Sequence, residues 1–517
     1  MSAYYEPSAY TQAYGQYGYD QTAYGQTTYD YTQATTQALT SKPEDTKPTS
    51  QYRMTSTMVI TCILAIVIAL VAFIALLVLV LGTGFGIGAE TDVPEDMDRP
   101  PLPSVYPVVR VPIPSSVMTT MATDTSITPT ASTQSPRTVM DQQPLVCTMG
   151  SRTSFLQMFP PDGLCEYIFF DSVEKGNRNP LAFPKRWGND LRIFIAAYAR
   201  YNTTAFGIGF AYEKASTLAR QLNTTSSSLL EPFWRKNIFH FGIVDTATRN
   251  AREADVELAL NVLKALNTHA ETQRRQGNPS FIFFAGVVFN QNWTNLYNDK
   301  FTNIYKPHLF IAQGHFFYGD NTFSDCRVMP PTALTRPQGL GDSYQHDLTL
   351  AADSFSKLSS RGLSIIGALS ITMKGRWTRT LPVQRPSDFL SGCVHNTSSP
   401  SFGRYSEICR NPKYRQRSYS QTHDAILAVH DTDNVLFAYD NEVGLCKKLC
   451  AVKGQHSGVR FGIAVYDLEY EDFSNACGAF NKYGAFTRLH AIRGIVNYFR
   501  TRFQSAPDAV GCRELIT

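Results

Sequence analysis

One uninterrupted apolar run divides this chain into parts that must fold in different surroundings. From Met58 to Leu81 the sequence reads MVITCILAIVIALVAFIALLVLVL, without a charged residue. At about 1.5 Å of rise per residue, a helix of about 24 residues is roughly 36 Å long. That length is enough to cross the hydrocarbon core of a bilayer with some tilt. The run therefore predicts one transmembrane helix over residues 58–81.

The charges on either side of this run predict its orientation. Lys42, Lys47 and Arg53 precede it, whereas the residues that follow it include several Asp and Glu between positions 90 and 98. Positively charged flanks stay in the cytosol, so we expect a signal anchor in a single-pass type II protein of the cell membrane. The N-terminus is then cytoplasmic and the C-terminal domain extracellular. A cleaved signal peptide is the alternative, but the run is too long and begins too far into the chain.

The segments around the predicted helix have the composition of unfolded chain. Residues 1–56 alternate Tyr with Gln, Gly and Thr and contain no aliphatic core pattern. They cannot bury enough apolar surface to offset the entropy lost on ordering, so they predict a disordered cytoplasmic tail that is available to cytosolic partners. Residues 82–144, rich in Ser, Thr and Pro, resemble an O-glycosylated stalk.

Sequons and cysteines agree with an extracellular location for residues 145–517. All the N-glycosylation sequons lie there, at Asn202, Asn223, Asn292 and Asn396. All cysteines except Cys62 also lie beyond the run, and their odd number leaves one thiol free or intermolecular. The cysteine spacing makes zinc improbable, and there is no phosphate-loop or dinucleotide motif, so we expect neither metal nor cofactor. A net charge of +4, evenly spread, argues against a nucleic-acid partner.

Residues 145–517 carry eight short apolar or β-branched runs. The runs begin near Glu166, Leu191, Thr204, Asn237, Ser280, His308, Leu363 and Val459. Their continuous apolarity is typical of parallel strands that are buried on both faces. The run DVELALNVLKALNTHAETQ between the fourth and fifth carries the apolar stripe of a helix. Together they predict an α/β fold, a (β/α)8 TIM barrel with an insertion.

Four ordered segments in the last third resemble the family-18 glycoside hydrolases, the chitinases and chitinase-like proteins. The segments are SITMKGRW at 370–377, RYSEIC at 404–409, LFAYDN at 436–441 and GIAVYDLEYEDFSNAC at 462–477. The resemblance implies a small α+β insertion, about 378–435, between strands 7 and 8. It also implies two disulfides, one between Cys147 and Cys165 around the first strand and one between Cys409 and Cys477.

The catalytic signature of that family is missing. The family carries D-x-x-D-x-D-x-E on strand 4, where the Glu protonates the leaving oxygen and the preceding Asp orients the acetamido group of the substrate. The best register places Asn237, His240, Gly242 and Val244 at these four positions. Gly and Val cannot transfer a proton. Asp245, the nearest carboxylate, should point away from the pocket unless the strand bulges.

A second group of acids imitates the signature near the end of the chain. Asp467, Glu469 and Glu471 alternate, but too few residues follow Glu471 for four further βα units. We therefore assign this stretch to the last strand and its rim, with a structural or rim-binding role.

Several aromatic and His side chains are candidates for the barrel mouth. Tyr466 replaces the family's Trp beneath the sugar, and His315 ends a segment that lacks the family's M-x-Y-D. We take Tyr466, Trp377, Tyr318 and Tyr439 as candidates for stacking on a sugar and His315 as a candidate lining residue. Ordinary core or rim packing is the alternative for each.

The sequence thus predicts a membrane-anchored, catalytically inactive chitinase-like protein. Its barrel would bind a protein partner or a glycan, chitin-like or otherwise containing N-acetylglucosamine. A second hypothesis is an active glycoside hydrolase with Asp245 or Glu471 as proton donor. A third is an adhesion or scaffold protein that binds no sugar.

Overall fold

The computed structural model describes residues 139–516, except for residues 225–228, 246–250, 341–342, 382–387, 415 and 431. These residues belong to one compact unit, Thr130–Thr517. The predicted tail, the predicted transmembrane helix at 58–81 and nearly all of the predicted stalk lie outside the described residues. Among the residues that are described, no helix combines the length and the apolarity needed to cross a membrane.

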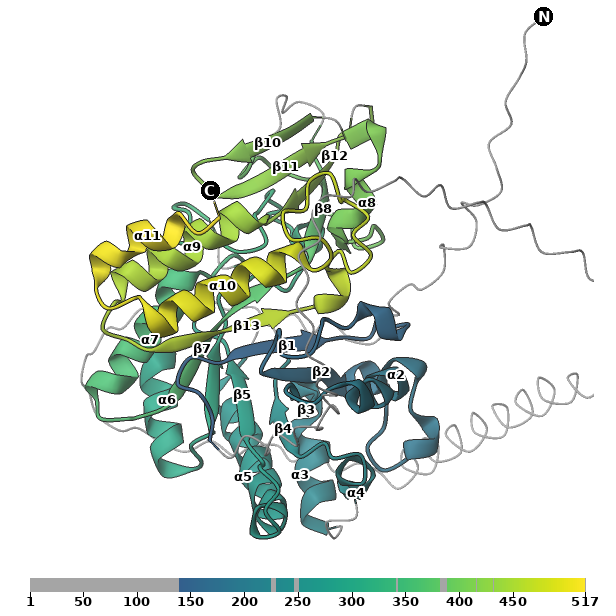
Figure 1. Ribbon diagram of the computed structural model, residues 1–517, viewed down its shortest axis with the longest axis vertical. Helices are drawn as coiled ribbons and strands as arrows, with labels where there is room; N and C mark the ends of the chain where they lie inside the picture. Colours follow the sequence, from purple (N-terminus) through teal and green to yellow (C-terminus); the bar gives the residue numbers. More distant parts are fainter. Residues whose placement is uncertain are drawn as a thin grey trace, which may run out of the picture. The chain divides into compact units, whose positions relative to one another are not determined.

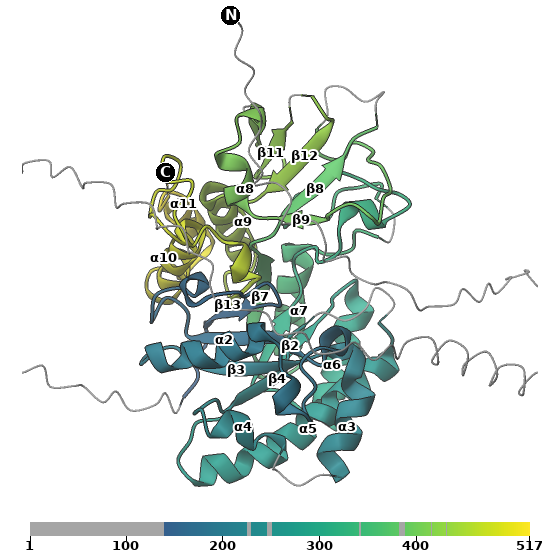
Figure 2. The same cartoon turned by 90° about the vertical axis from the view of Figure 1, so that its right-hand side faces the viewer.

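Eight parallel strands form a closed barrel, as the sequence predicts (Figure 1, Figure 2). Around the barrel their order is β1-β13-β7-β6-β5-β4-β3-β2. The strands are β1 Leu145–Met149, β2 Tyr167–Val173, β3 Ala205–Phe210, β4 His240–Ile243, β5 Ile282–Gly286, β6 Leu309–Ala312, β7 Ile366–Thr372 and β13 Phe461–Tyr466. Side chains alternate along each strand, so that Val146, Phe169 and Ile311 fill the interior while their neighbours pack against helices.

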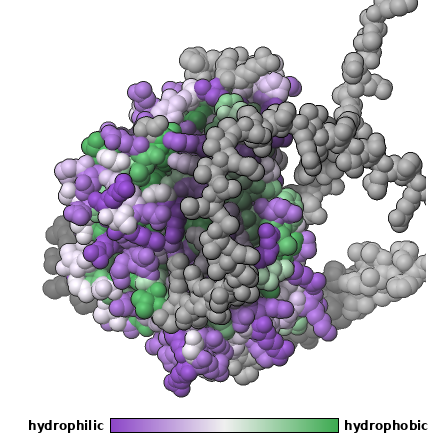
Figure 3. Space-filling view, viewed as in Figure 1, coloured by the Kyte–Doolittle hydropathy of each residue, from purple (hydrophilic) through white to green (hydrophobic). Residues whose placement is uncertain are grey.

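Helices cover the outside of the barrel (Figure 1). They are α2 Asn189–Ala197, α3 Ala215–Thr224, α4 Glu231–Trp234, α5 Glu253–Arg275, α6 Gln291–Asn303, α7 Leu348–Ser360, α9 Glu442–Gln455, α10 Thr487–Thr501 and α11 Ala509–Arg513. The helix α5 contains the stripe seen in the sequence, with Val256, Leu260 and Leu263 buried. On the face drawn in Figure 3, hydrophilic side chains predominate and apolar ones form small separate groups.

One of the eight predicted strands is wrong. The run that begins at Leu191 lies in α2, and the first barrel strand is β1, which was not predicted. Leu191 and Phe194 are buried whereas Arg192 is exposed, which is the spacing of a helix that rests on one face. Periodicity alone cannot distinguish a short apolar strand from a buried helix segment.

A second sheet interrupts the barrel between β7 and β13. Its five strands, in the order β10-β11-β12-β8-β9, pair antiparallel throughout. They are β8 Gly375–Arg379, β9 Phe402–Gly403, β10 Gln416–Ser420, β11 Ala425–Val429 and β12 Val435–Tyr439, with the short helix α8 Tyr405–Cys409 beside them. This α+β insertion extends slightly beyond both of the predicted limits, about 378 and 435.

Disulfides join distant parts of the described unit. Cys147–Cys165 and Cys409–Cys477 are the two pairs that the family resemblance implies. The structure adds two pairs that were not predicted, because sequence spacing does not specify connectivity. These further pairs are Cys326–Cys393 and Cys450–Cys512. The odd cysteine is Cys446, which is a buried thiol.

A buried carboxylate ties the start of the barrel to its last long helix. Glu166, which is 1 % exposed, accepts a hydrogen bond from the Leu145 backbone NH at 2.6 Å. Its other oxygen pairs with Arg493 and with Arg500, both on α10. Burial opposes its ionisation, but hydrogen bonds and charges from Arg500 and Arg493 hold the pKa of Glu166 below its usual value. Glu166 therefore joins β1, β2 and α10 as an ionised group.

We expect Glu166→Gln to destabilise the full chain by about 3 kcal/mol at neutral pH, because two arginines then lose their buried partner. A lowered folded-state pKa contributes stability that is complete above the usual pKa of Glu and is lost as pH falls through the folded value. The difference in melting temperature from wild type should therefore shrink in acid. Glu271→Gln, at an exposed site on α5, is the control and should melt as wild type does. A difference that is independent of pH would contradict an ionised Glu166.

Candidate functional site

The candidate site is the mouth of the barrel, at the carboxyl ends of its strands. The strand β4 brings no carboxylate to the interior of the barrel. Asn237 lies exposed in the turn before β4. The buried His240 accepts a hydrogen bond from the Phe281 NH at 3.1 Å, and its ring stacks on the Phe281 ring. Burial lowers the pKa of His240 to about 3, with a further contribution from His308, so the ring is neutral. Val244 packs in the apolar interior cluster.

The backbone leaves no room for an acid at the central position of β4. A Cβ atom on Gly242 would lie 2.5 Å from the carbonyl oxygen of Phe283 on the neighbouring strand. A Cβ atom on Gly209 of β3 would lie 2.5 Å from Val244 Cγ2 and 2.7 Å from the Phe170 carbonyl oxygen. Both contacts are closer than a side chain tolerates. The close packing of neighbouring strands thus excludes a carboxylate side chain at Gly242, and a single substitution does not restore it.

Tyr466, at the end of β13, closes the mouth. Its hydroxyl donates a hydrogen bond to the Val244 carbonyl oxygen at 2.7 Å. β13 and β4 lie on opposite sides of the barrel, four strands apart in either direction. The side chain therefore spans the barrel, and it is only 3 % exposed. In this position Tyr466 fills the space beneath the mouth and presents little surface on which a sugar could stack.

His315 packs beside Tyr466 and completes this closure. The ring centroids lie 4.9 Å apart, and His315 Nδ1 lies 2.8 Å from the Ser370 hydroxyl on β7. Burial, together with the charges of Lys374 and Arg376, lowers the pKa of His315 to about 3. A neutral, buried imidazole fits an apolar plug better than a proton donor at neutral pH.

Asp245, the first of the two candidate proton donors, lies in a buried environment. Its Oδ1 accepts a hydrogen bond from the Tyr212 backbone NH at 2.8 Å, and the side chain is buried. Asp245 lies two residues beyond Ile243, the last residue of β4, and its charge acts on Lys175 and on the Tyr466 hydroxyl at the mouth. Burial raises the pKa of Asp245 above its usual range; Lys175 opposes this shift and Asp171 adds to it.

Sequence reasoning missed Asp171 and Lys175, which belong to the same group of charges. Lys175 Nζ lies 3.1 Å from Asp171 Oδ1, but the lysine is 48 % exposed and solvent screens the pair. Asp171 also accepts a hydrogen bond from the Ser172 hydroxyl at 2.5 Å. The signal was available, because an Asp within the apolar run EYIFFDSV comes near the carboxyl end of the predicted strand.

The acids that follow β13 are held by internal partners. The residues Leu468–Tyr470 form a short 3-10 helix, so the acids do not alternate along a strand as the sequence suggests. Asp467 accepts from the Thr372 hydroxyl at 2.7 Å and pairs with Lys374, also at 2.7 Å. Glu469 accepts from the Gly150 NH at 2.9 Å.

Glu471, the second candidate proton donor, is fully buried. It accepts from the Arg488 backbone NH at 3.0 Å and from Arg488 Nε at 2.6 Å. A carboxylate that is committed to a buried arginine holds the fold together and cannot donate a proton to a ligand.

The other aromatic candidates lie away from Tyr466. Trp377, on β8, packs its ring 4.3 Å from that of Phe437 within the insertion sheet. Tyr439 of β12 is buried against Tyr405, with ring centroids 4.9 Å apart. The half-buried Tyr318 contacts Phe317 in the segment that follows β6, at 4.2 Å between ring centroids. The structure therefore brings Tyr466 and His315 together and places these three side chains elsewhere.

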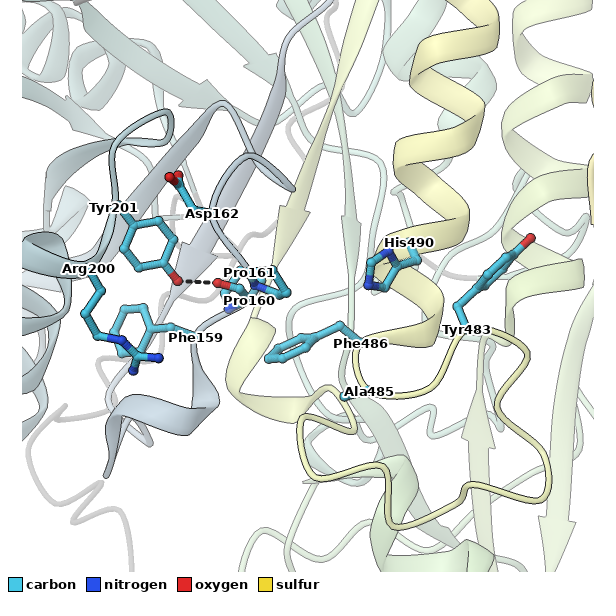
Figure 4. Close-up of a pocket in the computed structure, with 10 residues that line it drawn as sticks. All are labelled: Phe159, Pro160, Pro161, Asp162, Arg200, Tyr201, Tyr483, Ala485, Phe486 and His490. Atoms are coloured by element: carbon cyan, nitrogen blue, oxygen red, sulfur yellow. Dashed lines mark hydrogen bonds between the residues drawn. The ribbon is translucent and has the colours of Figure 1, made fainter. Parts of the chain in front are cut away.

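A cavity of about 520 Å³ lies apart from these residues, between the β1–β2 loop and the start of α10 (Figure 4). Phe159, Tyr201, Phe486 and His490 are among its lining residues. Two of its polar side chains have internal partners: the Tyr201 hydroxyl donates to the Pro160 carbonyl, and Asp162 accepts from the backbone NH groups of residues 202–204. We do not assign it to the candidate site.

These observations define a class of protein: a (β/α)8 barrel with an α+β insertion, whose mouth is filled by a tyrosine and a neutral histidine. No protein-family model matches the sequence, and no curated protein sequence is similar to it.

Solved structures of chitinases and chitinase-like proteins share this fold. The described unit is similar to TsES1, an immunomodulatory active chitinase from Trichuris suis, with a TM-score of 0.53 and 13% identity. It is also similar to human YKL-39, a pseudo-chitinase with retained chitooligosaccharide binding, and to a GH18 chitinase from Cycas revoluta in complex with (GlcNAc)3, each with a TM-score of 0.50 and 13% identity. Each alignment covers 68% of this chain and 99% of the other. An active chitinase and a pseudo-chitinase therefore share this fold.

Tyr466→Phe should destabilise the full chain by about 1–3 kcal/mol, because the Val244 carbonyl oxygen then loses its buried hydrogen bond. Tyr305→Phe is the matched control: the buried Tyr305 hydroxyl has no hydrogen-bond partner among the described residues, so its loss should cost little. Thermal unfolding of both variants measures the difference. Equal melting temperatures would show that the bond across the barrel contributes nothing.

Proposed function

We propose that this chain is a chitinase-like protein without glycosidase activity, whose barrel recognises a glycan or a protein from the rim of its mouth. The observation that carries the proposal is the interior of β4, where Gly242 has no space for a side chain and Val244 packs among apolar residues. The register that we infer from the sequence puts these two residues at the acid positions. Substrate-assisted hydrolysis needs a proton donor and an acetamido-orienting carboxylate at these positions. Neither is present.

The preferred ligand class is a glycan that contains N-acetylglucosamine. The fold shared with a pseudo-chitinase that retains chitooligosaccharide binding supports this choice. Because Tyr466 and His315 fill the interior, such a ligand would rest on the rim and not descend toward β4. A barrel that recognises only a protein remains the alternative ligand class, and an adhesion or scaffold protein with no sugar ligand is the third hypothesis. If the full chain binds no glycan on a glycan array, that result would favour the protein ligand or the adhesion or scaffold protein.

We further propose that the barrel is displayed outside the cell by a type II anchor at residues 58–81. The apolar run and its charged flanks support the anchor. The disulfides and the exposure of Asn202, Asn223, Asn292 and Asn396 support an oxidising, glycosylating compartment for the domain.

The purified full chain should release no product from chitotetraose, as measured by mass spectrometry beside an active chitinase. Val244→Glu should not create activity, because the orienting carboxylate at Gly242 is still missing. Both results follow from the packing of β4 against β5, which leaves no room for a side chain at Gly242.

One observation favours an active enzyme instead, namely the raised pKa of the buried Asp245. If that acid works, the wild-type chain hydrolyses chitotetraose and Asp245→Asn abolishes the reaction. Asp299→Asn, at an exposed site on α6, is the control that must leave the rate unchanged. That pair of results would overturn the inactive assignment. Glu471→Gln is less informative, since it also breaks a buried ion pair.

Topology is tested on tagged full-length chain in mammalian cells. Antibody to a C-terminal tag should stain intact cells, whereas antibody to an N-terminal tag should stain only permeabilised ones. Removal of N-linked glycans should increase gel mobility, and replacement of all four sequon asparagines by Gln should abolish that shift. Staining of the N-terminal tag on intact cells would contradict the proposed orientation.

A further inference from the structure

Four arginines gather around the loop that follows β13 and pair with no carboxylate among the described residues. Arg152 lies over the Tyr470 ring, with its guanidinium carbon 5.0 Å from the ring centroid. Arg404 donates to the Glu469 carbonyl oxygen at 2.9 Å and lies over the Phe473 ring.

The other two arginines contact the same loop further along the chain. Arg410 donates to the Ala476 carbonyl oxygen at 2.5 Å. Arg417 lies over the Phe480 ring at 4.9 Å from its centroid, and it also donates to the carbonyl oxygens of Tyr414, Ile408 and Cys409. We call Arg152, Arg404, Arg410 and Arg417 the arginine cluster.

None of the four arginines forms an ion pair among the described residues, although the loop itself holds the buried acids Glu469 and Asp472. Backbone carbonyls and aromatic rings orient guanidinium groups but carry no net charge to balance them. Glu407 is an exposed carboxylate on α8, yet it forms no ion pair with any of the four, and Glu471 is paired with Arg488. Arg152 and Arg410 are exposed, and Arg404 and Arg417 are partly exposed, so an anion from solution can reach the cluster.

The loop beneath the cluster is rigidly held. The buried Asp472 accepts from the Ala476 and Cys477 NH groups, both at 2.8 Å, and from the Asn481 amide at 2.8 Å. The Cys409–Cys477 disulfide then fixes the loop to α8, beside which it runs in Figure 1. An anion would thus meet guanidinium groups that are already oriented, which lowers the entropy lost on binding.

We propose that the arginine cluster binds a linear polysaccharide that carries sulfate groups. The guanidinium fork matches the oxygens of sulfate and binds them through charge-assisted hydrogen bonds. Several fixed arginines along one loop suit a chain with repeated anions better than a single small anion. This surface does not use the barrel mouth, so the inference is separate from the proposed chitin-type ligand and shares with it only the extracellular location.

The test measures binding of the purified full chain to immobilised heparin at 0.15 M NaCl. The triple variant Arg152→Gln, Arg404→Gln, Arg410→Gln should bind about tenfold more weakly than wild type. The control triple Arg192→Gln, Arg275→Gln, Arg361→Gln removes the same charge from exposed sites on other faces and should stay within about twofold. Arg417 is left in place because its hydrogen bonds support the fold.

Three outcomes would overturn the proposal: no binding of wild type to heparin, an equal loss in both triples, or equal binding to desulfated heparin. Tight binding to polyglutamate that the cluster variant also loses would assign the surface to an acidic protein instead. If the melting temperature shows that Arg404→Gln unfolds the chain, the double variant Arg152→Gln, Arg410→Gln and the double control Arg192→Gln, Arg275→Gln give the same comparison.

Discussion

The hydrogen bond that Tyr466 donates across the barrel to the Val244 carbonyl oxygen determines what the mouth can hold. It joins the ends of two strands on opposite sides of the barrel, and the neutral His315 ring packs against it. With this plug in place, the interior beneath the mouth is apolar and filled. A ligand that approaches the carboxyl ends of the strands meets the rim and the insertion, and we therefore propose that recognition takes place on the rim.

Much of this architecture could be predicted from the sequence. Continuous apolar runs gave seven of the barrel strands, and the segments around Arg376, Tyr405 and Tyr466 indicated the insertion and the last strand. The one wrong strand has a physical reason. The short apolar segment at Leu191 fits a buried strand and a helix with one buried face equally well, and only its packing in α2 distinguishes the two. Two disulfides also escaped prediction because they join segments that only the folded chain brings together.

The sequence indicates which residue types lie on β4, but not which side chains fill the mouth. Residue type alone shows that Gly242 and Val244 carry no acid, but the contact that forbids one at Gly242 comes from Phe283 on another strand. The family resemblance predicts Tyr466 as a residue that stacks on a sugar, because the family carries Trp there, whereas the structure buries it. Local sequence does not encode a contact across the barrel. It also does not encode the contacts of the arginine cluster with carbonyl oxygens and aromatic rings that lie elsewhere in the sequence.

We propose that Tyr466 and Val244 close the mouth and keep sugars out of the barrel interior. A crystal structure of the chain soaked with chitotetraose tests this most directly. We expect the Tyr466–Val244 hydrogen bond to persist and any ordered sugar to lie on the rim. An N-acetylglucosamine ring seated beneath the mouth, with Tyr466 displaced and the sugar in contact with Asp245, would contradict it.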